Sequence, residues 1–144
     1  MSRANRLLPA SLVSCVALAA LSLTGCGDRE TIIPTYPVSG RVLRGDVPIF
    51  YATVVLHPKS DIGDQSLRPR GVTNADGTFS LTTFTADDGA PAGDYEVSVT
   101  QWTTDKPEEG PKNRLAGKYA DPATSGIQIK VSSGPNEVPA IVIP

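Results

Sequence analysis

Residues 93–100 read GDYEVSVT and show the clearest strand pattern in the chain. Its apolar side chains Tyr95, Val97 and Val99 alternate with polar residues at positions 96, 98 and 100. Alternation with a period of two is typical of a β-strand that turns one face to a core and the other to solvent. Gly93 lets the chain bend sharply into this strand. We expect the Tyr95 ring to pack beneath the bend, with its hydroxyl group on a backbone atom.

The same pattern repeats on both sides of that stretch. Short segments of alternating hydrophobicity are separated by Gly, Pro, Asn and Asp, the residues that favour turns. The 13 Gly and 13 Pro residues fit a chain with many turns, and no segment after residue 25 shows sustained helical periodicity. We therefore predict an all-β fold with almost no helix, a seven-stranded antiparallel β-sandwich. Its strands are expected at residues 38–43, 51–57, 70–73, 79–82, 95–100, 127–131 and 138–143.

The connections between these strands fall into tight turns and longer polar stretches. Residues 74–77, Asn-Ala-Asp-Gly, predict a hairpin turn in which Gly77 suits a position that side chains with a Cβ resist. Phe79, just after the turn, can fill the core. Residues 59–69 and 103–126 are predicted to be irregular, and a stretch as long as the second is either functional or mobile.

The N-terminus has the three-part plan of a secretory signal. Arg3 and Arg6 form a basic head, and residues 7–23 form an apolar run. The run closes on LTGC at residues 23–26, which resembles a bacterial lipobox. In lipoproteins this cysteine is acylated and the signal is cleaved before it, so the resemblance implies a lipid anchor on Cys26 and several acyl chains that hold it stably at a membrane.

The alternative is a transmembrane helix that ends in a chance cysteine. Pro9, the serines within the run and its borderline length argue against that alternative. In well-studied two-membrane bacteria an Asp directly after the cysteine retains lipoproteins in the inner membrane. Gly27 stands there instead, which favours the outer membrane of a cell envelope. The expected organisation is a signal peptide at 1–25, a lipid-anchored tether at 26–36 and one sandwich domain at 37–144.

Composition excludes several classes of function. The chain has 144 residues, and removal of residues 1–25 would leave 119, enough for one domain with a single core. Because Arg3 and Arg6 would leave with the signal, 11 of the 13 basic residues would remain against 15 acidic ones. That acidic balance disfavours a nucleic-acid partner. Cys15 lies inside the signal, so an acylated Cys26 would leave no thiol for a disulfide, for catalysis or for a zinc site.

The order of the strands and turns resembles a carboxypeptidase regulatory-like domain, a member of the transthyretin-type (prealbumin-like) β-sandwiches. The resemblance covers roughly residues 36–144 and implies a transthyretin-like Greek-key sandwich. Residues 118–126, KYADPATSG, also resemble a signature of small bacterial lipoproteins built on this domain. The motifs that carry the resemblance are VSGRV at 38–42, ATVVL at 52–56, TNADGTF at 73–79 and PAGDYEV at 91–97.

No residue set in the sequence predicts catalysis, a metal or a cofactor. His57 is the single histidine, whereas an imidazole metal site normally uses two or three, and a catalytic triad needs partners for its base. The acidic turns at 74–77 and 87–88 offer too few oxygen ligands for calcium, so turn capping is the favoured reading. A carboxypeptidase would need far more chain, and the transthyretin-related hydrolase of purine breakdown has several active-site histidines that this chain lacks. We therefore expect a protein that is not an enzyme.

Two aromatic residues are candidates for ligand binding. Trp102 ends the fifth expected strand beside a long polar stretch, and Tyr119 lies in an irregular segment. Exposed rings among polar residues suit stacking on sugars, although buried aromatics at the ends of sandwiches are commoner. The favoured expectation is a non-catalytic structural or protein-interaction module at the cell envelope, which presents loops 59–69 and 103–126 to a partner. The alternative is a carbohydrate or small-ligand binder that uses Trp102 and Tyr119, and the exposure of the two rings decides between them.

Overall fold

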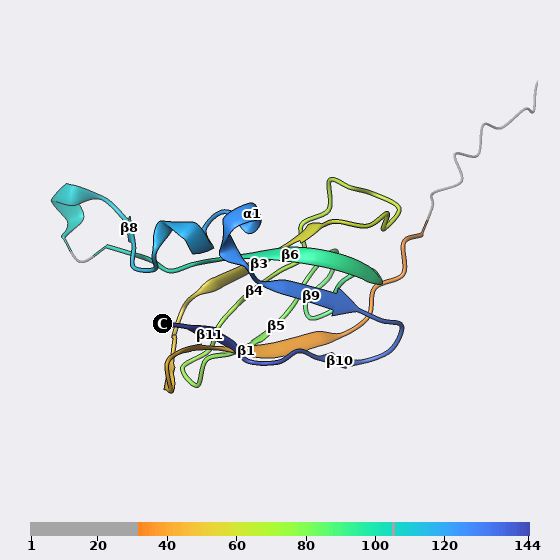
Figure 1. Ribbon diagram of the computed structural model, residues 1–144, viewed down its shortest axis with the longest axis horizontal. Helices are drawn as coiled ribbons and strands as arrows, with labels where there is room; N and C mark the ends of the chain where they lie inside the picture. Colours follow the sequence, from red (N-terminus) through yellow and green to blue (C-terminus); the bar gives the residue numbers. More distant parts are fainter. Residues whose placement is uncertain (1–31, 105) are drawn as a thin grey trace, which may run out of the picture. The chain divides into compact units, whose positions relative to one another are not determined.

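The strand predicted from GDYEVSVT lies at the centre of a four-stranded antiparallel sheet (Figure 1). The computed structural model describes residues 32–104 and 106–144. Thr53 pairs with Thr100, so β3 and β6 run side by side over six residue pairs. The order of this sheet is β4 (Arg70–Val72), β3 (Thr53–Pro58), β6 (Gly93–Thr100) and β9 (Gln128–Val131).

A second sheet is built around β1 (Val38–Arg44). A purely antiparallel sheet was expected, but this one is mixed. β2 (Val47–Pro48) and β5 (Thr78–Ser80) pair with β1 antiparallel, whereas β10 (Asn136–Glu137) and β11 (Ile141–Ile143) pair with it in parallel. The parallel pairs arise because the turn after β9 returns the chain at the start of β1, where Asn136 lies opposite Val38. The chain then follows β1 in the same direction.

The last expected strand, 138–143, is two shorter strands, and the number of strands exceeds seven in the part of the chain that the structure describes. Pro139 separates β10 from β11, because proline has no N–H to donate to a ladder. The all-β class is confirmed, and several of the strands are only two residues long.

The buried side chains of the two sheets form one hydrophobic cluster. On β6 the residues predicted to face inward, Tyr95, Val97 and Val99, are all fully buried. Residues of the same phase on β3 and β1 are buried with them, as the alternation predicts. The cluster includes Val38, Val42, Val54, Leu56, Phe79, Leu81, Ile129, Val131, Ile141 and Ile143.

The entry to β6 has the predicted form. The Tyr95 hydroxyl group donates a hydrogen bond of 2.7 Å to the carbonyl oxygen of Pro91, and burial raises the pKa of Tyr95 to about 12. Gly93 provides space there, because a Cβ at this position would lie 2.6 Å from Ile62 Cγ2. Gly77 has φ of 78°, and a Cβ there would lie 2.6 Å from the carbonyl oxygen of Val42, so the prediction for this turn is confirmed.

The stretch 103–126, expected to be irregular, contains a small hairpin and short helical turns. β7 (Trp102–Thr103) pairs with β8 (Lys112–Asn113) around the 3₁₀ turn Pro107–Glu109. A second 3₁₀ turn, Gly117–Tyr119, leads to α1 (Pro122–Ser125). Asp121 caps α1 through a 2.9 Å hydrogen bond from Ala123 N, and Gly126 ends it with φ of 71°. In α1, local capping residues therefore impose a helical turn where no hydrophobic periodicity exists.

Candidate functional site

Three exposed aromatic rings gather at one end of the sandwich. Phe50 and Tyr51 form the turn between β2 and β3, and Trp102 follows the end of β6. Because Thr53 pairs with Thr100, the antiparallel register brings the turn and Trp102 to the same end of the sheet. Trp102 is 54% exposed, and both rings of the turn are more exposed still. We call Phe50, Tyr51 and Trp102 the aromatic end.

Hydrogen bonds join the two segments that carry these rings. Gln101 Nε2 donates to the carbonyl oxygen of Phe50 at 2.8 Å, and Gln101 N donates to Asn113 Oδ1 at 2.9 Å. Trp102 pairs with Asn113 across the β7–β8 hairpin. The Phe50 and Tyr51 rings are 5.8 Å apart between centroids and tilted by 54°, within the range of favourable aromatic pairs.

The turn that holds Phe50 and Tyr51 is fixed from below by Thr73. The buried Thr73 hydroxyl group donates to the carbonyl oxygen of Ile49 at 2.6 Å and accepts from Ala52 N at 2.8 Å. Tyr51 N donates to the carbonyl oxygen of Thr73, and Tyr51 has φ of 60°, a left-handed conformation that is rare for a bulky residue. The two rings therefore stand on a backbone that the core restrains.

The expected pair of exposed rings, Trp102 and Tyr119, does not form. Tyr119 is 6% exposed and belongs to the hydrophobic cluster, and Lys118 Nζ lies 4.8 Å from the centroid of its ring. The 3₁₀ turn at Gly117–Tyr119 packs toward β6, which explains why this aromatic residue is buried. Of the two candidates, Trp102 alone presents a ring to solvent.

Phe50 and Tyr51 are not among the predicted site residues, because the strand predicted at 51–57 places Tyr51 in a sheet and leaves Phe50 as a single connecting residue before it, whereas β3 begins at Thr53. The sequence holds a signal for them, since Ile49, Phe50, Tyr51 and Ala52 are four consecutive apolar residues. An alternating strand can bury only every second residue, so part of such a run must face solvent or turn. Ile49 and Ala52 are buried, and the two aromatic residues between them are not.

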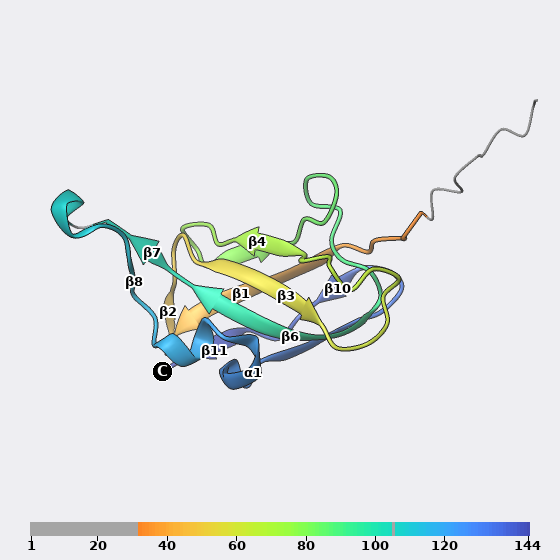
Figure 2. The ribbon, with the colours of Figure 1, turned by 90° about the horizontal axis from the view of Figure 1, so that it is seen from above.

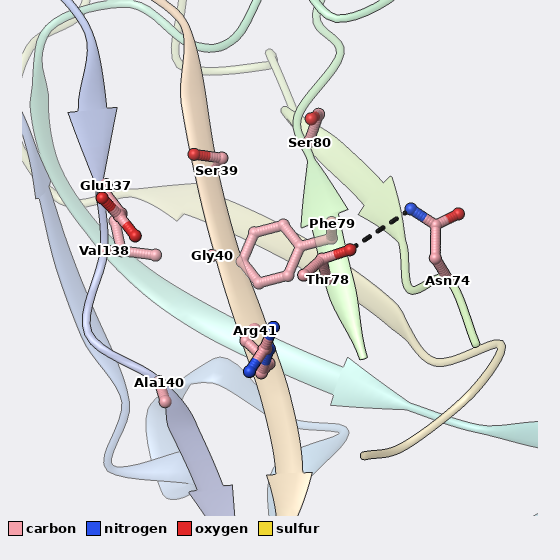
Figure 3. Close-up of a pocket in the computed structure, with 10 residues that line it drawn as sticks. All are labelled: Ser39, Gly40, Arg41, Asn74, Thr78, Phe79, Ser80, Glu137, Val138 and Ala140. Carbon is pink, nitrogen blue, oxygen red and sulfur yellow. Dashed lines mark hydrogen bonds between the residues drawn. The ribbon is translucent and has the colours of Figure 1, made fainter. Parts of the chain in front are cut away.

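A groove crosses β10, β1 and β5 near the middle of the second sheet (Figure 3). It has a volume of about 400 Å³ and forms where Gly40 lacks a side chain between Phe79 and Val138. Its rim carries polar groups that include Arg41 and Glu137, the one carboxylate that lines it. A single carboxylate without a histidine suits hydrogen bonding to a polar molecule better than acid–base catalysis.

His57 and Ser98 form a pair that the sequence did not reveal. His57 Nε2 lies 2.9 Å from Ser98 Oγ across the β3–β6 ladder. Burial lowers the pKa of His57, Arg68 lowers it further, and Glu96 and Asp121 partly offset both effects. Ser98 is only 6% exposed, so its hydroxyl group is not open to a substrate. The pair satisfies two partly buried polar groups, as structural hydrogen bonds do.

The acidic turns serve as caps. The Asp76 carboxylate accepts hydrogen bonds from Thr78 N and Thr78 Oγ1, at 3.1 Å and 2.6 Å. The Asp88 carboxylate accepts from the backbone N–H groups of Thr83, Phe84 and Thr85. Within residues 32–104 and 106–144, no group of three or more His, Cys, Asp or Glu side chains is placed to hold a metal ion.

Cys26, the predicted lipidation site, and the signal peptide at 1–25 lie outside the described residues, as does the first part of the expected tether. Of the expected tether, the structure describes residues 32–36. Among the described residues, no helix is long and apolar enough to cross a membrane.

A scan against protein-family models and a search of curated proteins gave no match. Among solved structures, the chain is similar to a 9R-lipoxygenase from Cyanothece PCC8801, with a TM-score of 0.40 and 19% identity; the similarity covers 77% of this chain and 17% of the lipoxygenase. It is also similar to the dioxygenase domain of a dioxygenase carbohydrate-binding protein fusion from Streptomyces sp. SirexAA-E, with a TM-score of 0.35 and 22% identity over 78% of this chain and 82% of that domain. Similarities at this level carry no argument about activity.

Proposed function

We propose that this protein is an exported lipoprotein, anchored at a membrane of the cell envelope through Cys26. Its domain at 37–144 is a carboxypeptidase regulatory-like sandwich of the transthyretin type. The domain acts as a non-catalytic interaction module, and its partner binds at the aromatic end. The lipid holds the protein at the membrane, residues 26–36 give it reach, and the sandwich presents rigid rings to the partner.

The observation that carries this proposal is the position of the aromatic end relative to the point where the tether joins the domain. Residues 32–36 lead into the start of β1. The end of β1 pairs with β2, and Phe50 follows β2 after one residue. The length of β1, about 20 Å at 3.3 Å per residue, therefore separates the tether from the rings. A partner on the aromatic end would meet the face of the domain farthest from its anchor.

The exposed side chains at the aromatic end favour a protein as the partner. Phe50, Tyr51 and Trp102 are exposed at this end, and Val47 and Val72, on the strands next to the Phe50–Tyr51 turn, are exposed as well. Several exposed apolar side chains in one region favour an interaction surface over isolated surface positions. Aromatic residues dominate the energetics of protein–protein interfaces, and rings held in fixed positions lose little entropy on binding.

The anchor is tested by the intact mass and membrane fractionation of the wild type beside Cys26→Ser, expressed in a bacterial host. We expect a mature form that begins at Cys26 with added acyl mass in the membrane fraction. The Cys26→Ser variant should lose both. A wild type without acyl mass in the soluble fraction contradicts the anchor.

The interaction surface is tested by a photo-crosslinking amino acid at position 51, with position 130 as a matched control. Tyr51 and Lys130 are both exposed, and Lys130 lies on β9 at the end of that strand opposite the aromatic end. We expect a discrete crosslinked protein from position 51 in cells and none from position 130. Equal crosslinking from both positions contradicts a specific surface.

A second candidate is binding of a carbohydrate at the aromatic end, which the exposed Trp102 favours. Sugars stack on flat rings, and Gln101 and Thr103 flank Trp102 with hydrogen-bonding groups. Trp102 is the single tryptophan, so its fluorescence reports on this site alone. Saturable change of that fluorescence with soluble cell-wall glycan fragments, weakened in Tyr51→Ala, would establish the carbohydrate reading in place of a protein partner.

A further inference from the structure

The end of the sandwich where the tether enters carries one prominent exposed ring, Phe84. It lies in the loop at residues 82–89 and is 56% exposed, nearly the same as Phe50 at 58%. The flanking Thr85 and Ala86 are also exposed. The two phenylalanines are thus matched in type and exposure but sit at opposite ends of the domain.

Hydrogen bonds within the loop hold Phe84 in place. The Asp88 carboxylate accepts from Thr83 N at 2.6 Å, Phe84 N at 2.9 Å and Thr85 N at 3.1 Å. The Thr83 hydroxyl group donates to the carbonyl oxygen of Gly89 at 2.6 Å, which closes the loop at its base. Phe84 therefore projects from a structured loop rather than from a loose one.

The base of this loop is joined directly to the tether (Figure 2). Tyr36 N donates to the carbonyl oxygen of Ala90 at 2.9 Å, and Ala90 N donates back to Tyr36 at 3.0 Å. Gly89 packs so closely that a Cβ there would lie 1.7 Å from the Tyr36 carbonyl oxygen. Any force or attachment that holds the tether near a surface therefore also holds this loop near it.

The length of the tether sets how near that surface is. Tyr36 lies ten positions after Cys26, and even a fully extended chain over ten positions spans at most about 35 Å. With the acyl chains of Cys26 in the bilayer, the Phe84 loop stays within reach of the membrane at all times. A tethered contact of this kind is intramolecular, so a weak contact is populated far more than it would be for a free domain.

We infer that the Phe84 loop is a second membrane contact, in which the Phe84 ring enters the interface of the bilayer that holds the Cys26 lipid. This inference rests on the proposed lipid anchor and concerns the opposite end of the domain from the partner surface. The loop carries two acidic residues, Asp87 and Asp88, and no basic residue, so the contact suits a neutral headgroup region better than a strongly anionic one. It would keep the long axis of the domain pointed away from the membrane and the aromatic end free for a partner.

The test uses tryptophan fluorescence in the lipidated protein, reconstituted in vesicles of dibrominated phosphatidylcholine. Bromine atoms on the acyl chains quench a tryptophan that enters the bilayer. The loop reporter is F84W in a W102F background, and the matched control is F50W in the same background. Wild-type Trp102 serves as a third reporter, and flotation of the vesicles measures anchoring separately.

We expect emission of the F84W/W102F protein to shift to the blue and to be quenched, while F50W/W102F and the wild type stay unquenched. A second readout is a probe that measures the distance between the domain and the lipid headgroups. By this readout, Phe84→Ser should lower the ratio of protein with the loop at the membrane to protein with the loop away from it by about tenfold, the effect of removing one partly buried aromatic ring. Phe50→Ser should leave that ratio unchanged.

The outcomes separate the two proposals. Protein that floats with the vesicles but shows no quenching of F84W/W102F overturns the membrane contact and leaves the anchor standing. Equal quenching of F84W/W102F and F50W/W102F also overturns it, because the domain would then lie flat without a preferred loop. Protein that does not float overturns the anchor, and the membrane contact falls with it.

Discussion

The interior of the sandwich and the segment 101–126 are built by different forces. In the interior, burial of alternate apolar side chains such as Tyr95 and Val97 fixes the position of each strand. Leu115 and Tyr119 of the segment join the same hydrophobic cluster. The rest of the segment is ordered by polar side chains that bond to the backbone or to each other, as Asn113 does to Gln101 N and Asp121 does to Ala123 N. Hydrophobic burial spreads its effect over a whole cluster, whereas each of these hydrogen bonds acts on one turn.

This difference has a consequence for where function can reside. The interior tolerates little change, because its side chains pack without large voids. The segment and the neighbouring Phe50–Tyr51 turn can vary in their exposed rings while the sandwich beneath them stays intact. The side chains of the aromatic end can therefore change without loss of the fold, whereas those of the interior cannot.

The largest expected contrast is between Tyr95→Ala and Trp102→Ala. Tyr95 is fully buried between the sheets, and truncation of a buried aromatic residue costs about 3–5 kcal/mol of unfolding free energy. Trp102 is half exposed, and its truncation should cost less than about 1 kcal/mol. Urea unfolding of both variants measures the difference. Similar losses in the two would mean that the segment and the interior are one packed unit.

Two glycines give a smaller contrast at nearly equal backbone angles. Gly77 and Gly126 have φ of 78° and 71°, but a Cβ at Gly77 would lie 2.6 Å from a carbonyl oxygen and one at Gly126 meets nothing within 4 Å. Gly126→Ala should cost about 1 kcal/mol for its left-handed backbone alone. Gly77→Ala should cost about 2–3 kcal/mol, because the turn must also move. Equal losses by urea unfolding would show that space around the turn is unimportant.

Two threonines test whether hydrogen bonds matter more under the aromatic end than in the hairpin. Thr73 is buried and bonds Ile49 and Ala52, so Thr73→Val should cost about 1–3 kcal/mol and speed amide exchange at Tyr51 and Ala52. Thr103 is partly exposed and accepts from Arg114 Nε at 2.9 Å. Thr103→Val should change stability by less than about 0.5 kcal/mol. Unchanged exchange at Tyr51 in Thr73→Val would contradict the restraint of the turn.

The interior could be predicted well from the sequence, because burial of alternate apolar side chains leaves a regular pattern. Alternation identifies which face of a strand is buried, and β1, β3 and β6 are all found near their expected positions. Gly77 and Tyr95 were predictable because a positive φ and a buried hydroxyl group each admit few residue types. The parallel pairing of β10 and β11 with β1 could not be predicted, because a local sequence pattern does not specify which strands are neighbours in a sheet.

The candidate site was predicted only in part. Trp102 is exposed as its polar surroundings suggest, but Tyr119 has similar polar neighbours in sequence and is buried. What separates them is the 3₁₀ turn at Gly117–Tyr119, which folds its segment back on β6, and tertiary packing of this kind leaves no periodic trace. Phe50 and Tyr51 were not predicted as exposed, because the alternating pattern of the strand that follows them extends to Tyr51 in the sequence.

The smallest expected effect lies where the two regions meet, at His57 on β3, which hydrogen-bonds Ser98 and lies near Asp121 of the segment. Burial first, and then Arg68, lowers the pKa of His57 from its ordinary value of 6.5. The unfolded chain therefore binds a proton more readily than the folded one. The stabilisation is fully present above pH 6.5 and is lost as the pH falls through the folded pKa.

We expect the urea midpoint of the wild type to fall between about pH 7.5 and about pH 5.5, a range in which most carboxylates remain ionised. His57→Gln, which keeps a group able to bond Ser98 but does not titrate, should flatten that change. A midpoint that rises on acidification, or an equal fall in His57→Gln, would contradict the prediction. Suppose that the urea midpoint falls with pH, and that acidification speeds amide exchange in α1 before it speeds exchange in β3. His57 then couples the stability of the outer segment to that of the sheet. If exchange rises equally in α1 and β3, protonation of His57 destabilises the whole domain, and the outer segment has no separate coupling to it.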